Sequence, residues 1–485
     1  MYLGLDLGTS GLKALLIDAG QRVIGSASAP LRVSRPHSGW SEQDPADWIT
    51  AAEQAIGALR AAHPAEFAAL RGIGLSGQMH GATLYDVADR ALRPSILWND
   101  TRAATEAEEL DARPAFRALS GNIVFPGFTA PKLVWVARHE PDLFARTAKV
   151  LLPKDALRLW LTGEHVSEMS DASGTAWLDV GARDWSDELL QASGMTREQM
   201  PRLVEGSAVS GELRGELRAR WGLKAPVIVA GGAGDNAAAG IGMGVLGEGQ
   251  GFVSLGTSGV IFAANDAFRP APQSAAHAFC HALPARWHQM AVSLSATDAL
   301  EWQARLCGMS AEALDAELPA RLPPPGTVQF LPYLGGERTP HNDARIRGVF
   351  AGLEHASDRP ALTRAVMEGV AFALADGLAV LRDQGSEPER LLAVGGGTRS
   401  ARWLEILANA LALPIALPER GEHGAALGAA RLALIAESGT PAETVCTPPP
   451  VARVIEPVPA LAEPYREAHQ RFRQLYRAQA ALIAG

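Results

Sequence analysis

The stretch LDLGTSGLKALLIDA, from Leu5 to Ala19, contains a Leu-Gly-Thr-Ser-Gly turn that returns in SLGTSGVIFAA, from Ser254 to Ala264. Each copy lies between two apolar runs, which is the pattern of a hairpin between short strands. Similarity at this distance favours two related α/β domains over an array of short repeats. We place the boundary, and a hinge, near the glycine-rich run 240–251, which gives domains at 1–243 and 244–485.

The composition is that of a globular chain with more than one domain. Its 485 residues are 47% apolar and 20% charged, which excludes a disordered protein. The formal net charge of −9 and the lack of a basic stripe argue against a nucleic-acid partner. Three scattered cysteines disfavour disulfides and a cysteine zinc site. Without a signal-peptide pattern or an apolar run of about 18 residues, we expect a cytoplasmic protein with no membrane partner.

The first domain is expected to begin with three strands, Tyr2–Leu7, Leu12–Asp18 and Val23–Ala29, paired as antiparallel hairpins because their connections are short. Asp44 and Pro45 mark the start of a helix, as its N-cap and its first residue. Further strands are expected at 71–76, 82–86, 95–98, 226–230, 251–255, 259–264 and 391–394. Further helices are expected at 362–381, 403–411 and 425–436.

Each Gly-Thr-Ser-Gly turn offers backbone N–H groups and two hydroxyls at one tip. Glycine allows positive φ angles that point successive N–H groups the same way, and such concave arrays bind anions. Ordinary hairpin turns also favour Gly, Ser and Thr, but two copies after similar strands favour two tips that hold one polyphosphate. The predicted phosphate-binding residues are Thr9, Ser10, Gly256, Thr257 and Ser258.

Two charged residues flank the first turn. Asp6 ends an apolar strand, where a carboxylate beside phosphates is useful if Mg²⁺ bridges them through water. Lys13 would add positive charge near the transferring group, because phosphoryl transfer depends on charge neutralisation and alignment. The structural alternatives are an aspartate that caps its own turn and a solvated surface lysine.

The stretch AGGAGDNAAAG, from Ala230 to Gly240, places Asp235 after an apolar strand and before a helix of small residues. Such a carboxylate can be a helix N-cap, or it can be a general base that takes the proton of an acceptor hydroxyl. The surrounding glycines and alanines would let a substrate approach closely, which favours the base. Its neighbour Asn236 is assigned with it to the substrate site.

Two more stretches follow predicted strands and carry polar groups suited to a small polyol or sugar, GQMHG and LWND. The predicted sugar contacts are Gln78, Met79, His80, Trp98, Asn99 and Asp100. A tryptophan ring can stack on a sugar face, and the polar side chains can bind hydroxyls. A structural role for His80, core packing for Trp98 and capping for Asp100 remain open.

The common nucleotide signatures are absent or misplaced. No lysine follows a glycine, which excludes the G-x-x-x-x-G-K-[ST] loop, and two G-x-G-x-x-G matches at 72–77 and 242–247 lack the strand-to-helix context. LAVGGGTRS, from Leu391 to Ser400, is instead a strand, a glycine turn and a helix start, where an adenine ring can lie against bare backbone. LPYLGGERTPH, from Leu331 to His341, is dense in polar groups, and its chemistry alone assigns it no role.

Taken together, these stretches resemble the FGGY family of carbohydrate kinases, within the actin–hexokinase–Hsp70 superfamily. GFTAPKLVWVARH, at 127–139, fits one family pattern throughout, and GVFAGLEHASDRPALTRAVME, at 348–368, fits a second except at Ala361. The resemblance implies an α/β fold of two ribonuclease-H-like domains with ATP and sugar in the cleft between them. It also implies that Asp235 is the catalytic base and Asp6 the carboxylate near the metal. The adenosine half of ATP would meet Gly396, Gly397 and Ser400.

Within the family, the stretches SGQMHGATL, LWND, GGAGDNAA and LPYLGGERTPH are similar to members that phosphorylate D-xylulose. We therefore expect phosphoryl transfer from ATP, with Mg²⁺, to the 5-hydroxyl of that sugar. The alternatives are an FGGY kinase for ribulose, gluconate or glycerol, a non-catalytic sensor of ATP and sugar, and an actin-like filament protein. A homodimer is expected only by analogy with the family.

Overall fold

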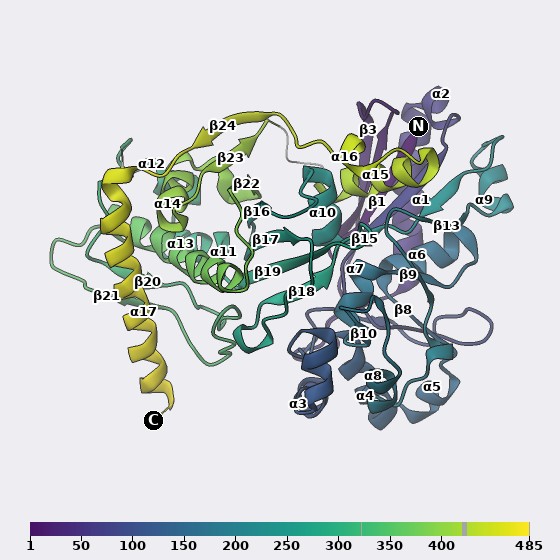
Figure 1. The fold of residues 1–485 in the computed structure, drawn as a ribbon, viewed down its shortest axis with the longest axis horizontal. Coiled ribbons are helices and arrows are strands. Elements are labelled where there is room, and N and C mark those ends of the chain that lie inside the picture. The colour runs from purple at the N-terminus through teal and green to yellow at the C-terminus, as the bar shows by residue number, and fades with distance from the viewer. Residues whose placement is uncertain (322, 420–423, 485) are drawn as a thin grey trace.

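The computed structural model describes residues 1–321, 323–419 and 424–484. Two mixed β-sheets, each covered by helices, make up the chain (Figure 1). The predicted α/β fold with two related domains is confirmed. In the described part of the chain, no helix is both long enough and apolar enough to span a membrane.

The first sheet is built around the opening hairpins, and its strand order is β13-β14-β5-β1-β2-β3. The bounds are β1 (Tyr2–Leu7), β2 (Gly11–Ile17), β3 (Val23–Pro30), β5 (Gly72–Gly77), β13 (Val209–Glu212) and β14 (Ile228–Ala230), with β15 (Ala233–Gly234) paired to β5. Strands β1, β2 and β3 pair antiparallel, as predicted, whereas β5 and β14 join in parallel. The opening turn therefore projects from the C-terminal end of β1.

The second sheet repeats this arrangement, with the order β18-β19-β17-β16-β22-β23-β24. The bounds are β16 (Gln250–Leu255), β17 (Gly259–Asn265), β18 (His277–Cys280), β19 (Trp287–Ser293), β22 (Arg390–Val394), β23 (Ile415–Pro418) and β24 (Val451–Ile455). Three antiparallel strands, β19, β17 and β16, are again followed by two parallel ones, β22 and β23. The echoed turn thus occupies the same position in both sheets.

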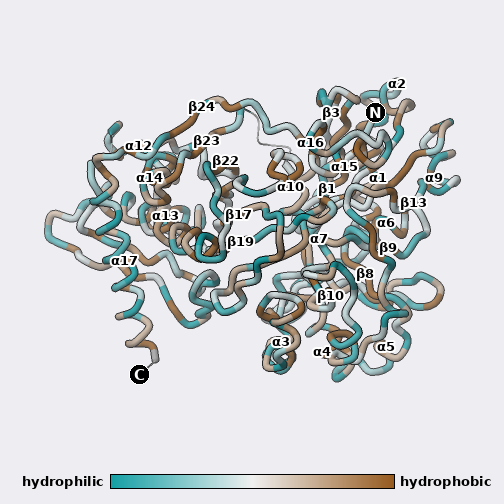
Figure 2. The backbone as a smooth tube through the Cα atoms, in the orientation of Figure 1, coloured by the Kyte–Doolittle hydropathy of each residue, from teal (hydrophilic) through white to brown (hydrophobic). Residues whose placement is uncertain are grey.

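Helices cover both sheets. The predicted start of the first helix is confirmed: the Asp44 side chain accepts a hydrogen bond from Ala46 N, and Pro45 is the first helical residue. The first sheet carries α1 (Pro45–Ala62) and α6 (Pro153–Thr162), and the second carries α11 (Thr297–Cys307), α13 (Arg359–Asp383) and α14 (Ala401–Leu411). Helix α17 (Ala462–Ala484) packs beside α14 and is largely hydrophilic along its length (Figure 2).

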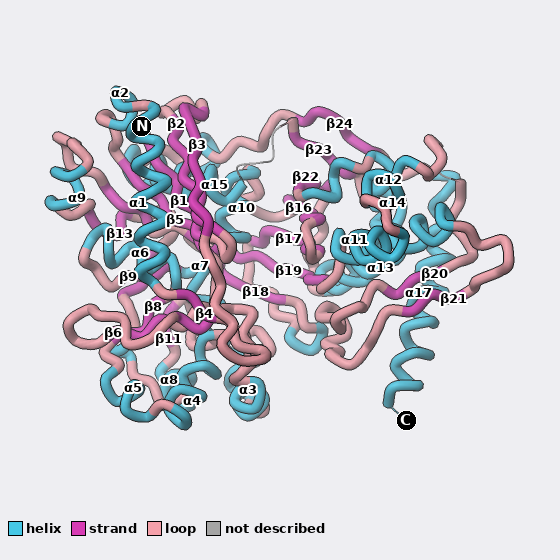
Figure 3. The backbone as a smooth tube through the Cα atoms, turned by 180° about the vertical axis from the view of Figure 1, so that it is seen from behind, coloured by secondary structure: helices cyan, strands magenta, loops and turns pink. Residues whose placement is uncertain are grey.

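Two helices of small residues lie together between the sheets, α10 (Asp235–Met243) and α15 (Gly424–Ser438) (Figure 3). Their backbones nearly touch, since a Cβ atom on Gly428 would overlap the carbonyl of Ala238. Helix α15 lies between β23 and β24 of the second sheet in the sequence but packs against β1, β5 and β14 of the first. The first sheet is therefore completed by a helix from the second half of the chain. The predicted boundary and hinge near 240–251 stay predictions.

The remaining elements are short strands and further helices. The short strands pair as β4 (Glu42–Gln43) with β7 (Ser95–Ile96), β6 (Thr83–Tyr85) with β8 (Lys149–Leu151), β9 (Val166–Glu168) with β12 (Arg202–Val204), β10 (Leu178–Asp179) with β11 (Asp184–Trp185), and β20 (Gln329–Leu331) with β21 (Val349–Ala351). The other α-helices are α2 (Pro64–Phe67), α3 (Ala104–Asp111), α4 (Thr129–His139), α5 (Pro141–Arg146), α7 (Met169–Ala172), α8 (Asp187–Ala192), α9 (Gly215–Arg220), α12 (Ala311–Ala316) and α16 (Ala442–Val445).

Candidate functional site

The first hairpin tip is tied to the body of its domain through Thr9. Gly8 N donates to Gly11 O at 3.0 Å and closes the turn. The Thr9 hydroxyl donates to Gln78 Oε1 and accepts from Trp98 Nε1, both at 2.9 Å. Ser10, at the outermost position, is exposed. The structure therefore brings three of the predicted site residues together, and the Thr9 proton is already donated within the protein.

The second tip has a matching anchor on helix α11. Thr297 donates to Gly256 O through both its backbone N, at 2.9 Å, and its hydroxyl, at 2.8 Å. Ala296 N donates to Thr257 O at 2.8 Å, and the Thr257 side chain is exposed. Ser258 closes the turn by accepting from Gly256 N at 3.1 Å. Because the carbonyls point into the protein, the outer side of the turn is open to a ligand.

Asp6 lies in the middle of the first sheet and is held by neighbours on both sides. In the strand register it faces Lys13 on β2 and Ser76 on β5. The Ser76 hydroxyl donates to Asp6 Oδ1 at 2.9 Å. Burial raises the pKa of Asp6, and the Ser76 hydrogen bond and the Lys13 charge oppose that rise. The predicted neighbourhood of Asp6 and Lys13 is thus present in the fold.

Asp235 is the first residue of α10, and Gly234 occupies the N-cap position, so the capping role that the sequence left open does not apply. The backbone N and the side-chain Nδ2 of Asn236 donate to Asp235 Oδ1 at 2.7 and 2.9 Å. Burial, followed by the negative charge of Asp6, raises the pKa of Asp235 to about 6. A carboxylate with such a pKa is well matched to accept a proton near neutral pH.

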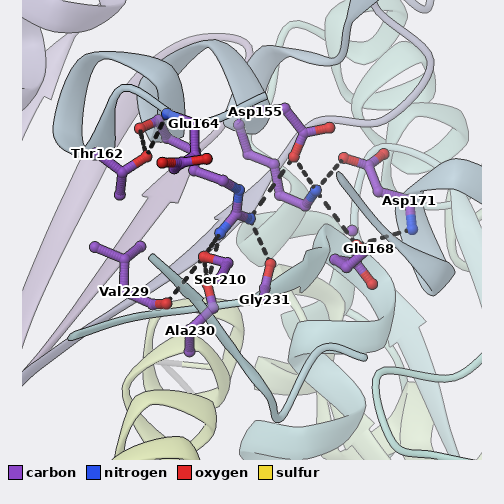
Figure 4. Close-up of polar contacts among 12 residues, drawn as sticks. Asp155, Thr162, Glu164, Glu168, Asp171, Ser210, Val229, Ala230 and Gly231 are labelled. Atoms are coloured by element: carbon purple, nitrogen blue, oxygen red, sulfur yellow. Dashed lines mark hydrogen bonds and ion pairs between the residues drawn. The ribbon is translucent and has the colours of Figure 1, made fainter. Parts of the chain in front are cut away.

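A network of buried charged side chains, shown in Figure 4, was not predicted from the sequence. Lys154 Nζ forms ion pairs with Asp155 at 2.7 Å, with Asp171 at 3.0 Å and with Glu168 at 3.3 Å, and all four side chains are fully buried. Burial raises the pKa of Asp171 well above its usual value. Buried groups of this kind hold their positions tightly, because separating them leaves an uncompensated charge.

Two contacts connect this network to the segment that carries Asp235. Arg158 donates to Ala230 O at 2.7 Å and also to Gly231 O, at the end of β14. Ser170, whose backbone N and hydroxyl donate to the Glu168 carboxylate, accepts from Gly234 N at 3.0 Å. The backbone on the N-terminal side of Asp235 is therefore fixed at both ends by hydrogen bonds to buried polar groups.

Met79 and His80 form a wall beside this segment. A Cβ on Gly234 would lie 2.9 Å from Met79 Cγ, which shows that the two residues are in close contact. His80 Nδ1 lies 2.6 Å from Gly174 O, and the ring stacks on Phe128 at 4.6 Å. Burial lowers the pKa of His80 to about 3, so the ring is neutral and carries its proton on Nδ1. Its Nε2 is then an acceptor for a hydroxyl.

The Gln78 side chain makes its hydrogen bonds to other residues of the protein. Its Nε2 donates to Gln43 Oε1 at 2.9 Å, and Gln43 Nε2 donates to Thr9 O at 2.7 Å. Together with the Thr9 hydroxyl, these bonds occupy the Gln78 amide and lock the hairpin onto β4. A direct sugar contact by Gln78 stays a prediction, and the geometry favours a role in positioning Thr9.

The LWND residues differ in side-chain exposure and in how many of their polar groups are already hydrogen-bonded. Trp98 is 46% exposed, which leaves a face of the ring for stacking. Asn99 Oδ1 is buried without a hydrogen-bond partner among the described residues. Asp100 accepts from Arg102 at 2.7 and 2.9 Å and from Ser41 N at 2.6 Å, so its carboxylate is occupied within the protein. The structural role that the sequence left open is thereby favoured for Asp100.

A cavity of about 340 Å³ adjoins the second hairpin. It is lined by the predicted residues Gly396, Gly397 and Ser400 and also by Thr297, Leu300, Glu301, Ala311, Glu312, Asp315, Arg399 and Trp403. The Ser400 hydroxyl donates to Asp315 Oδ1 at 2.7 Å and accepts from Trp403 N at 3.0 Å, which caps α14. The mixed apolar and acidic lining of this cavity suits an aromatic base and a ribose.

The chain matches the sequence models of two protein-family domains, which together span most of its length. The N-terminal domain of the FGGY family of carbohydrate kinases matches residues 1–242, and the C-terminal domain matches residues 251–437. The chain is 48% identical to a xylulose kinase of Escherichia coli over 487 residues, with all of both chains covered. It is 50% identical to a xylulose kinase of Klebsiella pneumoniae over 438 residues, or 90% of each chain.

Solved structures agree with these matches. The fold superposes on a crystal structure described as a xyloylose kinase from Brucella ovis with a TM-score of 0.98, at 65% identity and with 99% of each chain covered. A xylulose kinase from Rhodospirillum rubrum superposes with a TM-score of 0.91 at 31% identity, over the whole of both chains. The chain therefore belongs to the FGGY family of carbohydrate kinases.

Proposed function

We propose that this protein transfers the γ-phosphoryl group of ATP to the 5-hydroxyl of D-xylulose. Membership of the FGGY family makes it a carbohydrate kinase, for which ATP is the expected donor. The choice of D-xylulose is supported by the relatives named xylulose kinase, which cover the whole chain. The observation that carries the chemistry is the buried Asp235, whose pKa burial and the charge of Asp6 raise to about 6 and whose neighbour Gly234 is in contact with Met79.

In this mechanism Asp235 accepts the proton of the sugar hydroxyl as the oxygen attacks phosphorus. The Asn236 hydrogen bonds fix one carboxylate oxygen, so the other can face the substrate. Met79 presents an apolar surface to the carbon chain, and the neutral His80 accepts a hydroxyl hydrogen at Nε2. Alignment of this kind converts a bimolecular step into one within a complex, which can lower the barrier by about 7–11 kcal/mol.

The phosphate side of the site combines Asp6, Lys13 and the two hairpin tips. Asp6 and Asp235 interact as like charges, and a divalent cation between Asp6 and the nucleotide phosphates would offset that repulsion. Among the described residues no cluster of three or more His, Cys, Asp or Glu could hold a metal. A Mg²⁺ held by Asp6, water and phosphates fits this donor set, and it would supply charge neutralisation on the transferring group. The adenosine half is proposed to bind the cavity beside Gly396, Gly397 and Ser400.

The proposal extends to the setting of the enzyme. We propose a cytoplasmic enzyme whose only obligatory partners are the sugar and ATP, and a homodimer by analogy with the family. We further propose that the two domains close on their ligands about a hinge near residues 240–251 and exclude water from the phosphoryl transfer.

The experiment is ADP release with Mg-ATP and, in parallel, D-xylulose, D-ribulose, L-xylulose, gluconate, glycerol or no sugar. Strong dependence on D-xylulose is expected, and Asp235→Asn is expected to remove it, since loss of a general base typically costs about 10²–10⁴-fold. Asp142→Asn, an exposed aspartate on α5, is the matched control and is expected to retain activity. Preference for another sugar would overturn the substrate, and ATP binding without sugar-dependent turnover would favour the sensor.

A further inference from the structure

Arg338 lies in the loop 331–341, to which the sequence assigned no role, and this partly buried arginine differs from arginines whose side chains are buried elsewhere in the protein. Arg102, Arg158, Arg364 and Arg431 each donate to three or more acceptor atoms of the protein. The Arg338 guanidinium has one acceptor among the described residues, His277 Nε2 at 3.3 Å. Most of its donors are therefore left for a ligand.

The neighbouring carboxylate of Glu337 interacts with the charge of Arg338 but forms no ion pair with its guanidinium. Glu337 accepts from the Ser293 hydroxyl at 2.7 Å, from Leu294 N at 2.9 Å and from the backbone N of Arg338 at 2.7 Å. No ion pair joins Arg338 to a carboxylate in the part of the chain that the structure describes. A partly buried guanidinium with so few hydrogen-bond acceptors is costly unless something else supplies them.

The loop holds Arg338 rigidly from both sides. Glu337 is bonded to the end of β19 through Ser293, as described above. On the other side Thr339 N donates to Val292 O at 3.0 Å, and the Thr339 hydroxyl donates to Ala275 O at 2.9 Å. Because both neighbours are fixed, the fold sets the position of the Arg338 backbone from which the side chain extends, and a fixed backbone is what binding residues require.

The guanidinium points across the domain boundary, toward the wall that contains His80. It lies 4.5 Å from the ring of Phe125, and Phe128 stacks on His80 at 4.6 Å and on His277 at 5.9 Å. The charge of Arg338 also contributes to the lowered pKa of His80, which places the two side chains in one electrostatic environment.

The contacts form an ordered series along this wall. Gly234, next to the base, touches Met79; His80 follows, and then come Phe128, His277 and Arg338. Asp235 and Arg338 therefore stand at opposite ends of the series. A linear sugar whose reacting hydroxyl meets the base would extend its other end toward the guanidinium.

We propose that Arg338 binds the ketose end of the acceptor, donating to the carbonyl oxygen at C2 and the hydroxyl oxygen at C1. This inference rests on the proposed function, in which the 5-hydroxyl is at Asp235. A guanidinium suits the task because its N–H groups form a planar fork that meets two adjacent oxygens. Arg338 would thus be a specificity residue, supplied by the second half of the chain to a pocket built mainly by the first.

The test is steady-state kinetics of the full chain with Mg-ATP and three sugars: D-xylulose, 1-deoxy-D-xylulose, which lacks the C1 hydroxyl, and xylitol, which lacks the C2 carbonyl. For Arg338→Met, kcat/KM for D-xylulose is expected to fall about 50-fold, mostly through KM, with the KM for ATP unchanged. The loss should shrink to about 10-fold or less for 1-deoxy-D-xylulose and for xylitol, since each analogue has already lost or weakened one of the two contacts that the mutation removes.

Arg338→Lys should recover part of the loss, because one ammonium can replace one of the two hydrogen bonds. Arg345→Met is the matched control: Arg345 is exposed and lies just after the loop 331–341, so this variant should behave as wild type. Equal losses on all three sugars, or an equal rise in the KM for ATP, would overturn the role of Arg338. Failure of the wild type on D-xylulose would instead refute the proposed function.

Discussion

The backbone N–H of Gly234 donates a 3.0 Å hydrogen bond to the hydroxyl of Ser170, 64 residues earlier in the chain. Gly234 precedes the candidate base, and Ser170 is bonded to the buried Glu168. The position of the base therefore depends on a residue that touches neither substrate in the proposed mechanism.

Ser170→Ala is expected to lower kcat by about 10-fold, because even a small displacement of a catalytic group is costly. The KM for ATP should not change, since the nucleotide site is elsewhere. Ser193→Ala is the control: Ser193 is also buried and accepts from Trp177 Nε1 at 2.7 Å, but it lies away from the site. A similar fall in kcat for both variants would indicate a general loss of structure.

The pH dependence of activity should follow Asp235. Its pKa of about 6 means that the base is protonated in acid and free to accept a proton above that pH. We expect kcat/KM to rise with pH through about 6 and then level off. A profile that is flat from pH 5 to pH 8 would contradict the assignment of Asp235 as the base.

The same group should reduce stability when it is ionised. A carboxyl whose pKa is raised from its ordinary value of 3.8 to about 6 keeps its proton to higher pH in the folded chain, so the free energy of unfolding falls as pH rises between these values. Asp235→Asn is therefore expected to be more stable than wild type at pH 8, by about 2 kcal/mol, and not at pH 3.5. Thermal unfolding at the two pH values measures this, and equal stability at pH 8 would count against it.

Lys154→Met should destabilise the protein strongly. The substitution leaves Asp155, Glu168 and Asp171 buried without their shared cation, and breaking a buried pair costs about 3–5 kcal/mol. Denaturant unfolding should show a smaller loss in acid, where Asp171, whose pKa burial raises, takes up a proton and leaves one negative charge fewer. Lys224→Met, on the surface, is the control and should unfold like wild type.

Gly397→Val should weaken nucleotide binding. A Cβ at this position would lie 2.9 Å from Leu255 Cβ and 3.2 Å from Thr297 Cγ2, at the wall of the 340 Å³ cavity. We expect the KM for ATP to rise about 10-fold or more, with little change in the KM for the sugar. Gly57→Val, on a part of α1 where a Cβ meets nothing within 4 Å, should leave both constants unchanged. An unchanged KM for ATP in Gly397→Val would place the nucleotide elsewhere.

Local features of the fold were predictable from the sequence. The opening hairpins, the Asp44 cap and the strand-turn-helix around Gly396 depend on neighbouring residues, whose propensities and spacing are visible in one chain. The duplication was visible because the same turn occurs at the same place in both sheets. Pairing across the sheet was not visible, so the sequence did not indicate that Ser76 would face Asp6.

The sequence indicated which reactive side chains form the candidate site better than it indicated which residues hold them in place. Asp235 and His80 carry groups whose type suggests a use, whereas Ser170 and Arg158 act through backbone contacts across 64 and 73 residues of chain. Gln78 shows the opposite case. Its side chain suits a sugar, but Gln43, 35 residues earlier, occupies its amide. Long-range partners of this kind are set by topology, which a single sequence does not display.

The packing of α15 on the first sheet has a consequence for synthesis of the chain. Tyr2, Leu15 and Ile17 are buried together with Ala426 and other small residues of α15. Domains commonly fold in order as they leave the ribosome. This face of the first sheet, however, cannot be covered by α15 until about residue 438 has been synthesised. An apolar surface is thus open during most of translation, and growing chains that stall before α15 should be the ones that aggregate or recruit chaperones.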